Sequence, residues 1–120
     1  MLANSSRTRG PLFSTLADDP EMAPLVEEFV EGLADRVELL VDRLQASDND
    51  ALRRVAHQMV GSAGSYGFHE ITVDAATLET ALREGRPEEE IAGAVNSLID
   101  LCRRARAGTG DVRPGPNPTG

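Results

Sequence analysis

The first long apolar pattern in the chain repeats every three or four residues, which is the period of an amphipathic helix. It predicts a helix that begins at Asp19–Pro20, with the aspartate as N-cap and the proline at the first helical position. The helix runs to about Ala46, and extra apolar positions widen its buried face enough to contact two neighbours. The core-facing residues are Leu25, Phe29, Leu33, Val37, Leu40 and Leu44, and the widening residues are Val26, Val30 and Val41.

Three more segments show the same helical period, and polar or glycine-containing breaks separate them. They predict helices over about residues 50–65, 69–84 and 87–107. Residues 47–50 are polar and supply the caps of the second helix. Gly67 is expected to stop that helix in the left-handed conformation. Pro87 lies near the first turn of the last helix, where proline is tolerated.

Short turns between amphipathic helices are typical of a bundle, and nothing in the chain alternates with the period of a strand. We therefore expect an all-α protein, an antiparallel four-helix bundle with a short N-terminal lead-in segment. The lead-in contains Pro11, Leu12, Phe13 and Leu16, which are expected to pack as a turn. The domain is expected over residues 11–108, with a flexible N-terminus at residues 1–10 and a disordered tail at residues 109–120.

Composition and charge exclude several kinds of function. Aromatic residues make up only 3% of the chain, so the core must be aliphatic. The formal charge is −8, from 20 acidic and 12 basic side chains, which argues against nucleic-acid binding. No apolar run is long enough for a membrane span. The single cysteine, Cys102, excludes a disulfide framework and favours a cytoplasmic location, and its place in an apolar stripe predicts burial.

The candidate chemistry lies at His57, in the second predicted helix. At about 100° per residue, Gly61 and Gly64 fall on the same side of this helix as the histidine. Glycine inside a helix costs about 1 kcal/mol relative to alanine, so two of them beside one imidazole indicate that something large approaches it. A metal site is not expected, because His57 and His69 do not have the spacing of two ligands on one helical face.

This segment resembles the phosphorylation motif of histidine phosphotransfer (HPt) domains. The positions that agree are His57, Met59, Gly61, Ser62, Ala63, Gly64, Gly67 and Phe68. The resemblance continues through Leu78–Glu79, and the helical pattern around it covers about residues 12–107. Val60 departs from the family pattern, which usually has a lysine there. A valine offers no charge to a phosphoryl group.

The resemblance implies a phosphocarrier in a two-component phosphorelay. His57 would accept a phosphoryl group and pass it to or from the aspartate of a response-regulator receiver domain. The residue 22 positions further on, Glu79, would hold the imidazole through Nδ1, as in the phosphotransfer domain of chemotaxis-type histidine kinases. The receiver would bring the Mg²⁺, so the chain needs no cofactor or kinase activity of its own. A sensor histidine kinase is a second expected partner, and a monomer is expected.

Residues around His57 are expected to provide access for the receiver and a surface for docking. These residues are Gly61, Gly64, Val60, Arg53 and Gln58. Arg53 is one turn before His57 on nearly the same face and could substitute in part for the missing lysine, whereas Arg54 is expected further round the helix. The simpler interpretation of either arginine is a solvated surface residue.

Three alternatives stay open at this stage. Glu79 has a simpler interpretation as a surface residue paired with Arg83 at the next helical turn. With valine at position 60, the domain could bind a receiver without being phosphorylated. A small helical enzyme that uses His57 and Glu79 as an acid–base pair is the third possibility, and its weakness is that the sequence shows no substrate cleft.

Overall fold

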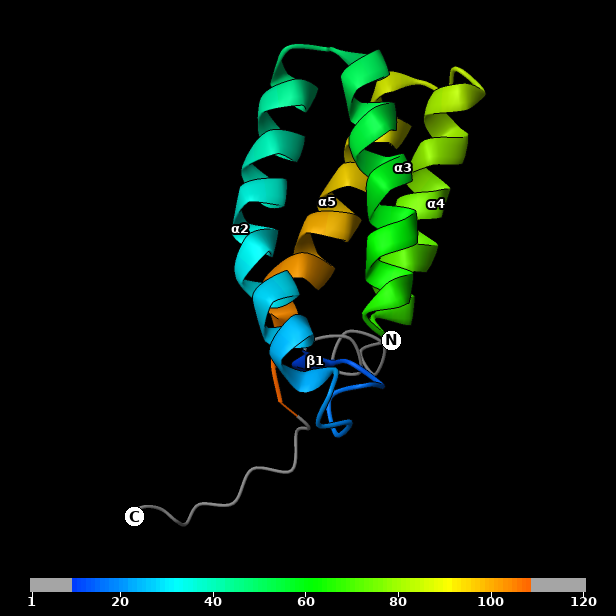
Figure 1. Ribbon diagram of the computed structural model, residues 1–120. Coiled ribbons are helices and arrows are strands. Elements are labelled where there is room, and N and C mark those ends of the chain that lie inside the picture. Colours follow the sequence, from blue (N-terminus) through cyan, green and yellow to red (C-terminus); the bar gives the residue numbers. More distant parts are fainter. Residues whose placement is uncertain (1–9, 109–120) are drawn as a thin grey trace.

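Four helices lie side by side in the part of the chain that the structure, a computed structural model, describes, which is residues 10–108. They are α2 (Ala23–Gln45), α3 (Asn49–Ser65), α4 (His69–Arg83) and α5 (Glu88–Arg104). Helix α3 packs against α4, α4 against α5, α5 against α2, and α2 against α3. The helices alternate in direction and enclose one core (Figure 1). The predicted all-α, antiparallel four-helix bundle is therefore confirmed.

The core is built almost entirely from aliphatic side chains, contributed by all of these helices. The largest fully buried residues are Phe68, Leu40, Leu52, Met59, Ile71, Leu78, Leu98, Val26 and Val95. One predicted core position is wrong, since Leu25 is 42% exposed. In the first turn of α2 the inward position belongs to the next residue, Val26, so the leucine faces solvent about 100° away.

Glycines stop two of the helices, and both have the geometry of a Schellman motif. Gly67 has a φ of +83°, and the next amide, on Phe68, donates to the carbonyl of Ala63 at 2.9 Å. Gly85 has a φ of +67° and ends α4 in the same way. The predicted left-handed stop at Gly67 is confirmed. This tight turn lets α4 return along α3.

The helix starts follow the sequence prediction in one case and depart from it in another. The carboxylate of Asp48 accepts the amide of Ala51 at 3.1 Å, so the predicted polar cap of α3 is present. The start of α2 is three residues later than predicted, at Ala23 rather than Pro20. The side chain of Asp19 instead caps a separate turn by accepting the amide of Glu21, and Pro24 is the proline of the first helical turn.

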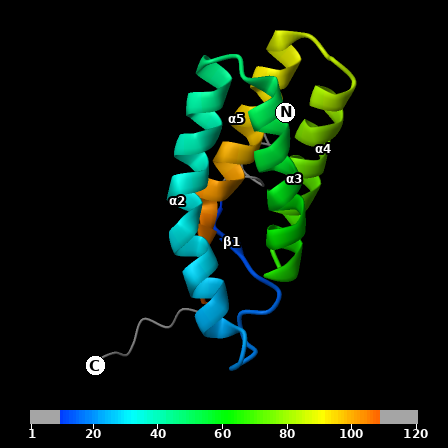
Figure 2. The same cartoon turned by 45° about the horizontal axis from the view of Figure 1, so that its top comes forward.

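The lead-in segment is held by a feature that the sequence pattern did not predict, a pair of two-residue strands. Strand β1 (Leu12–Phe13) runs parallel to β2 (Ala105–Arg106), so α5 ends at Arg104 instead of Ala107. The pair lies at the end of the bundle where α2 begins and α5 ends (Figures 1 and 2). Buried Ser14 adds a second attachment, because its hydroxyl donates to the carbonyl of Tyr66 at 2.6 Å.

No helix within residues 10–108 is both long enough and apolar enough to cross a bilayer. Residues 1–9 of the expected flexible N-terminus (residues 1–10) and the expected tail at residues 109–120 lie outside the described part of the chain.

Candidate functional site

His57 projects from the middle of α3 into solvent. The side chains of Ala56 and Met59 on the opposite side of the helix are fully buried and fix its rotation about its axis. The imidazole consequently stands outside the bundle, with 74% of its side chain exposed. A ring held this way has one free edge that a large partner can reach.

Glu79 reaches the inner edge of this ring from α4. Its Oε2 lies 2.8 Å from Nδ1 of His57, and its own side chain is only 18% exposed. A carboxylate can only accept, so the Nδ1–H donates and the neutral ring leaves Nε2 as the lone pair. No other residue of the described chain forms a hydrogen bond with this ring. Within the same residues no ion pair joins Glu79 to Arg83, which was the simpler interpretation from sequence.

A shallow, open depression of about 360 Å³ surrounds the pair. Its lining residues are Arg53, Arg54, His57, Gln58 and Glu79. Arg53 and Gln58, which were both expected to lie near the histidine, are found beside it. Arg54, which was expected further round the helix than Arg53, borders the same depression as well.

Val60 lies on the opposite side of the histidine from these arginines and does not line the depression. Its side chain is partly buried against the core, and its carbonyl accepts the hydroxyl of Thr72 at 3.3 Å. The position where a lysine was expected by resemblance is thus occupied by an apolar side chain at the α3–α4 contact.

The two glycines on the histidine face differ in their surroundings. A Cβ atom added at Gly61 would meet nothing within 4 Å, so this position is open to solvent. A Cβ at Gly64 would lie 3.3 Å from Oγ1 of Thr72 on α4. Packing therefore explains a glycine at position 64, because α3 and α4 approach closely there, in addition to any role in access. Packing does not explain the glycine at position 61.

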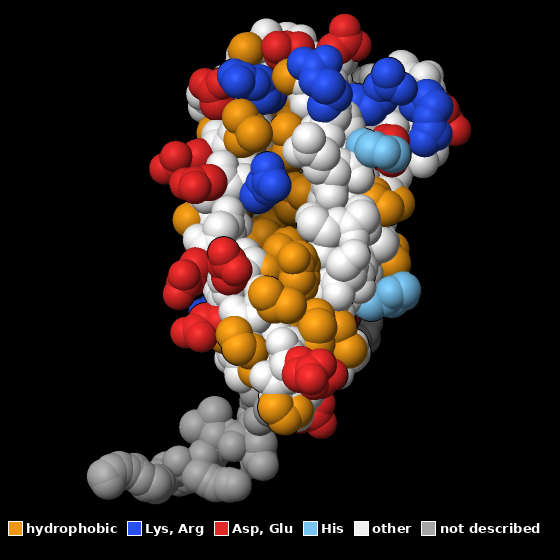
Figure 3. Space-filling view, in the orientation of Figure 1, with side chains coloured by type: hydrophobic (Ala, Val, Ile, Leu, Met, Phe, Trp, Pro, Cys, Tyr) orange, Lys and Arg blue, Asp and Glu red, His pale blue; other side chains and the backbone are white. Residues whose placement is uncertain are grey.

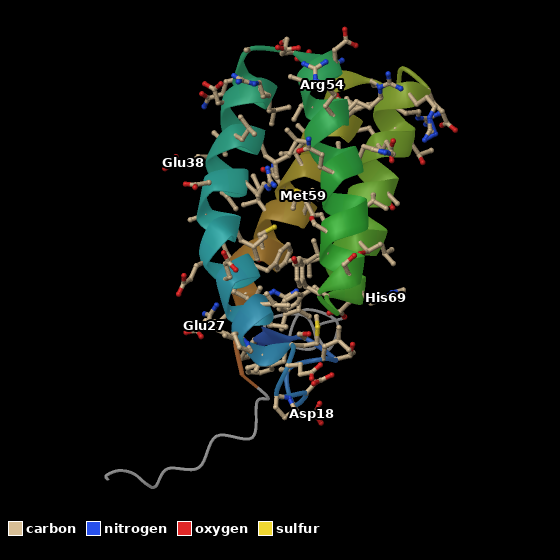
Figure 4. All side chains as sticks on the ribbon, in the orientation of Figure 1. Asp18, Glu27, Glu38, Arg54, Met59 and His69 are labelled. Carbon is tan, nitrogen blue, oxygen red and sulfur yellow. The ribbon has the colours of Figure 1, made fainter. Side chains whose placement is uncertain are left out.

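The second histidine is remote from this site. His69 is the first residue of α4, at the opposite end of α3 from Arg54 (Figure 4). Within residues 10–108 no three histidine, cysteine, aspartate or glutamate side chains gather as a metal ion would require. The chemistry that the arrangement offers is that of one exposed, oriented imidazole.

A family model describes this combination of a helical bundle and a histidine-bearing helix. The model of the Hpt domain matches residues 24–108, which is most of the chain. The chain belongs to the Hpt domain family. No curated protein and no solved structure gives a significant match. Hpt domains are histidine phosphocarriers of phosphorelays rather than kinases, and they work with receiver domains and kinases.

The surface of this Hpt domain has an uneven distribution of charge. Basic side chains gather at the end of the bundle near the α2–α3 turn, and acidic ones follow α2 (Figure 3). Between α2 and α3, a groove of about 570 Å³ is lined by both apolar and polar side chains and includes Leu25, Phe29 and Tyr66. The rings of Phe29 and Tyr66 stack with centroids 5.2 Å apart. The sequence analysis missed this groove because it placed Leu25 in the core.

Proposed function

We propose that His57 is the phosphoryl acceptor of this Hpt domain and that its Nε2 exchanges the group with the aspartate of a receiver domain. The observation that carries the proposal is the hydrogen bond from Nδ1 to Glu79 on a ring that is otherwise exposed. It leaves one nucleophilic nitrogen, directed away from the bundle.

In the transfer, the lone pair of Nε2 attacks phosphorus while the bond between phosphorus and the aspartyl oxygen breaks. The aspartate leaves as a carboxylate. The ring keeps its proton on Nδ1 and becomes positively charged, and the carboxylate of Glu79 lies 2.8 Å away to balance that charge. The reverse step restores the neutral ring. Transfer of this kind depends on position and charge neutralisation more than on covalent chemistry from the carrier.

Access for the receiver is supported by the same surface. The open space at Gly61 and the exposure of Gln58 leave the histidine side of α3 free of large obstacles. Gly64 keeps the adjoining part of α3 close to α4. We expect the receiver to hold the Mg²⁺ that neutralises the aspartyl phosphate, so this chain contributes no metal ligand.

A second candidate function is receiver binding without phosphorylation, and Val60 favours it. This residue puts an apolar side chain where a charged one would assist the phosphoryl group. In that case the domain would sequester receivers instead of exchanging phosphoryl groups with them.

One experiment separates the two functions. A panel of receiver domains is phosphorylated with a small-molecule phosphodonor and Mg²⁺, purified from the donor and mixed with the Hpt domain. The proposal predicts that at least one receiver loses its phosphoryl group and that acid-labile, base-stable phosphate appears on the Hpt domain. Binding of a receiver with no transfer would support the docking function instead.

A further inference from the structure

Two arginines line the depression around His57. Arg53 and Arg54 are both exposed, and neither forms a salt bridge within residues 10–108. They precede His57 by four and three residues, so both lie one turn away on neighbouring positions of the same helix. Within residues 10–108 no carboxylate forms an ion pair with their guanidinium groups, although the sequence contains 20 acidic side chains.

The residues of α3 that follow His57 carry no positive charge. Val60 is apolar and partly buried, and Gly61 and Gly64 carry no side chain. All 12 basic residues of the sequence are arginines, so no lysine exists anywhere to fill this role. The end of the bundle that contains Arg54 is where basic side chains gather (Figures 3 and 4).

We propose that Arg53 and Arg54 bind the phosphoryl oxygens when the group is on His57, from the N-terminal side of the histidine. The inference rests on the proposed phosphorylation of His57. It assigns to two arginines of the preceding turn the charge neutralisation that Val60 cannot provide.

The chemistry of both partners fits this assignment. A phosphoryl group on Nε2 carries up to two negative charges on three oxygens, and it would project into the depression that the arginines border. A guanidinium group presents its donors in a planar fork that matches such oxygens in pairs. Glu79 lines the same depression, but its carboxylate bonds Nδ1 and so leaves Nε2 free for the phosphoryl group.

The position of these arginines has a consequence for the receiver. Cationic groups on the N-terminal side leave the C-terminal side, at Gly61, open and uncharged. The receiver's own loops then enter over Gly61, and the phosphoryl group is held from the other direction. The two surfaces do not compete for the same space.

The test measures how the phosphoryl group is shared at equilibrium between a phosphorylated receiver and the Hpt domain. Arg53→Gln and Arg54→Gln, singly and together, are compared with the wild type and with Arg103→Gln as a control for loss of charge. Arg103 is exposed at the end of α5, outside the depression. We expect the equilibrium constant for transfer of the phosphoryl group to His57 to fall about tenfold for each arginine removed. This is the scale of a charge-assisted hydrogen bond. The control should match the wild type.

Two further measurements exclude a structural or docking role. The dissociation constant for the unphosphorylated receiver is measured for all three variants, and the fall in the phosphoryl equilibrium constant should exceed any loss of receiver affinity, because the arginines are proposed to bind the phosphoryl group. Adding Val60→Lys to the double variant should raise the equilibrium constant part of the way back to the wild-type value, because the lysine places a cation one turn from His57 on its C-terminal side.

The outcomes are distinguishable from failure of the proposed function. If the wild-type protein takes up no phosphoryl group from any receiver, the proposed function fails. If the wild type is phosphorylated and the double variant has the same equilibrium constant for phosphoryl transfer as the wild type, the assignment of Arg53 and Arg54 is overturned. A change confined to receiver affinity, with no change in the phosphoryl equilibrium, overturns it as well.

Discussion

Glu79 bonds His57 from a position that is far more shielded from solvent than the histidine itself. The two side chains are joined by 2.8 Å between Oε2 and Nδ1, but the histidine is 74% exposed and the glutamate only 18%. Water competes less for a shielded carboxylate, so the hydrogen bond orients the ring more firmly than a bond between two exposed side chains would. The exposed partner is left with a single available nitrogen.

Glu79→Ala is expected to change which nitrogen of the neutral His57 ring carries the proton. Without the acceptor, the population moves from the Nδ1–H form towards the Nε2–H form, and phosphoryl uptake slows by about tenfold or more because the nucleophilic nitrogen is masked and the ring is mobile. ¹⁵N NMR of the imidazole reports the tautomer directly. Glu84→Gln, at the exposed end of α4, serves as the control. An unchanged tautomer in Glu79→Ala would mean that the carboxylate does not set the orientation.

Gly61 should give the receiver access to His57 without contributing to stability. Gly61→Ala is expected to raise the free energy of unfolding by up to about 1 kcal/mol, since the added Cβ meets nothing and alanine favours the helix. Urea denaturation measures this. Gly61→Gln should also fold but should accept the phosphoryl group poorly, because a long side chain then lies beside the imidazole. A folded Gly61→Gln protein with wild-type uptake would place the receiver on another surface.

Gly67 and Gly85 form a matched pair for testing the turns. Both have positive φ, but a Cβ at Gly67 would overlap the Ser14 hydroxyl, whereas at Gly85 it would meet nothing. Gly85→Ala should cost about 1 kcal/mol, the penalty of the left-handed conformation alone. Gly67→Ala should cost about 3 kcal/mol or more, because the attachment of the lead-in segment to the α3–α4 turn must also shift. If thermal or urea unfolding shows equal losses of stability in Gly67→Ala and Gly85→Ala, the Ser14 contact is unimportant for stability.

Cys102 should behave as a buried thiol and report unfolding. It is nearly inaccessible, and burial raises the pKa of its thiol to about 12. We expect no reaction with a thiol reagent at pH 8 in the native state and rapid reaction in urea. The unfolded thiol ionises above about pH 8.5 while the native thiol stays protonated, so this group lowers stability as pH rises above that value, by about 2 kcal/mol at pH 10. Cys102→Ala should lack this part of the pH dependence, and an identical profile in both proteins would contradict it.

The helical part of the fold could be read from the sequence because its signals are local. The apolar period identifies each helix, and Gly67 and Gly85 mark the turns through their backbone conformation. The β1–β2 pair could not be found this way, because two residues are too short to show a strand period. The start of α2 was misplaced because Asp19 followed by a proline also suits a turn that precedes a helix.

The candidate site depended on knowledge beyond periodicity. His57 and Glu79 are 22 residues apart, so no helical spacing connects them, and the family resemblance supplied the pairing that the fold then brings to 2.8 Å. That Arg54 also borders the depression could not be predicted from the sequence, because the helical angle alone does not say how far a long side chain reaches. Gly64 was interpreted through access, whereas its contact with Thr72 is visible only once α4 is in place.

The central claim is that Nε2 of His57 carries the phosphoryl group. The most direct measurement is ³¹P and ¹⁵N NMR of the protein after transfer from a phosphorylated receiver, with His57→Gln as the matched variant. We predict one phosphohistidine signal, coupled to Nε2 of His57, in the wild type and none in His57→Gln, which should remain folded because the side chain is exposed. Phosphate on another residue, on Nδ1, or retained in His57→Gln would contradict the account.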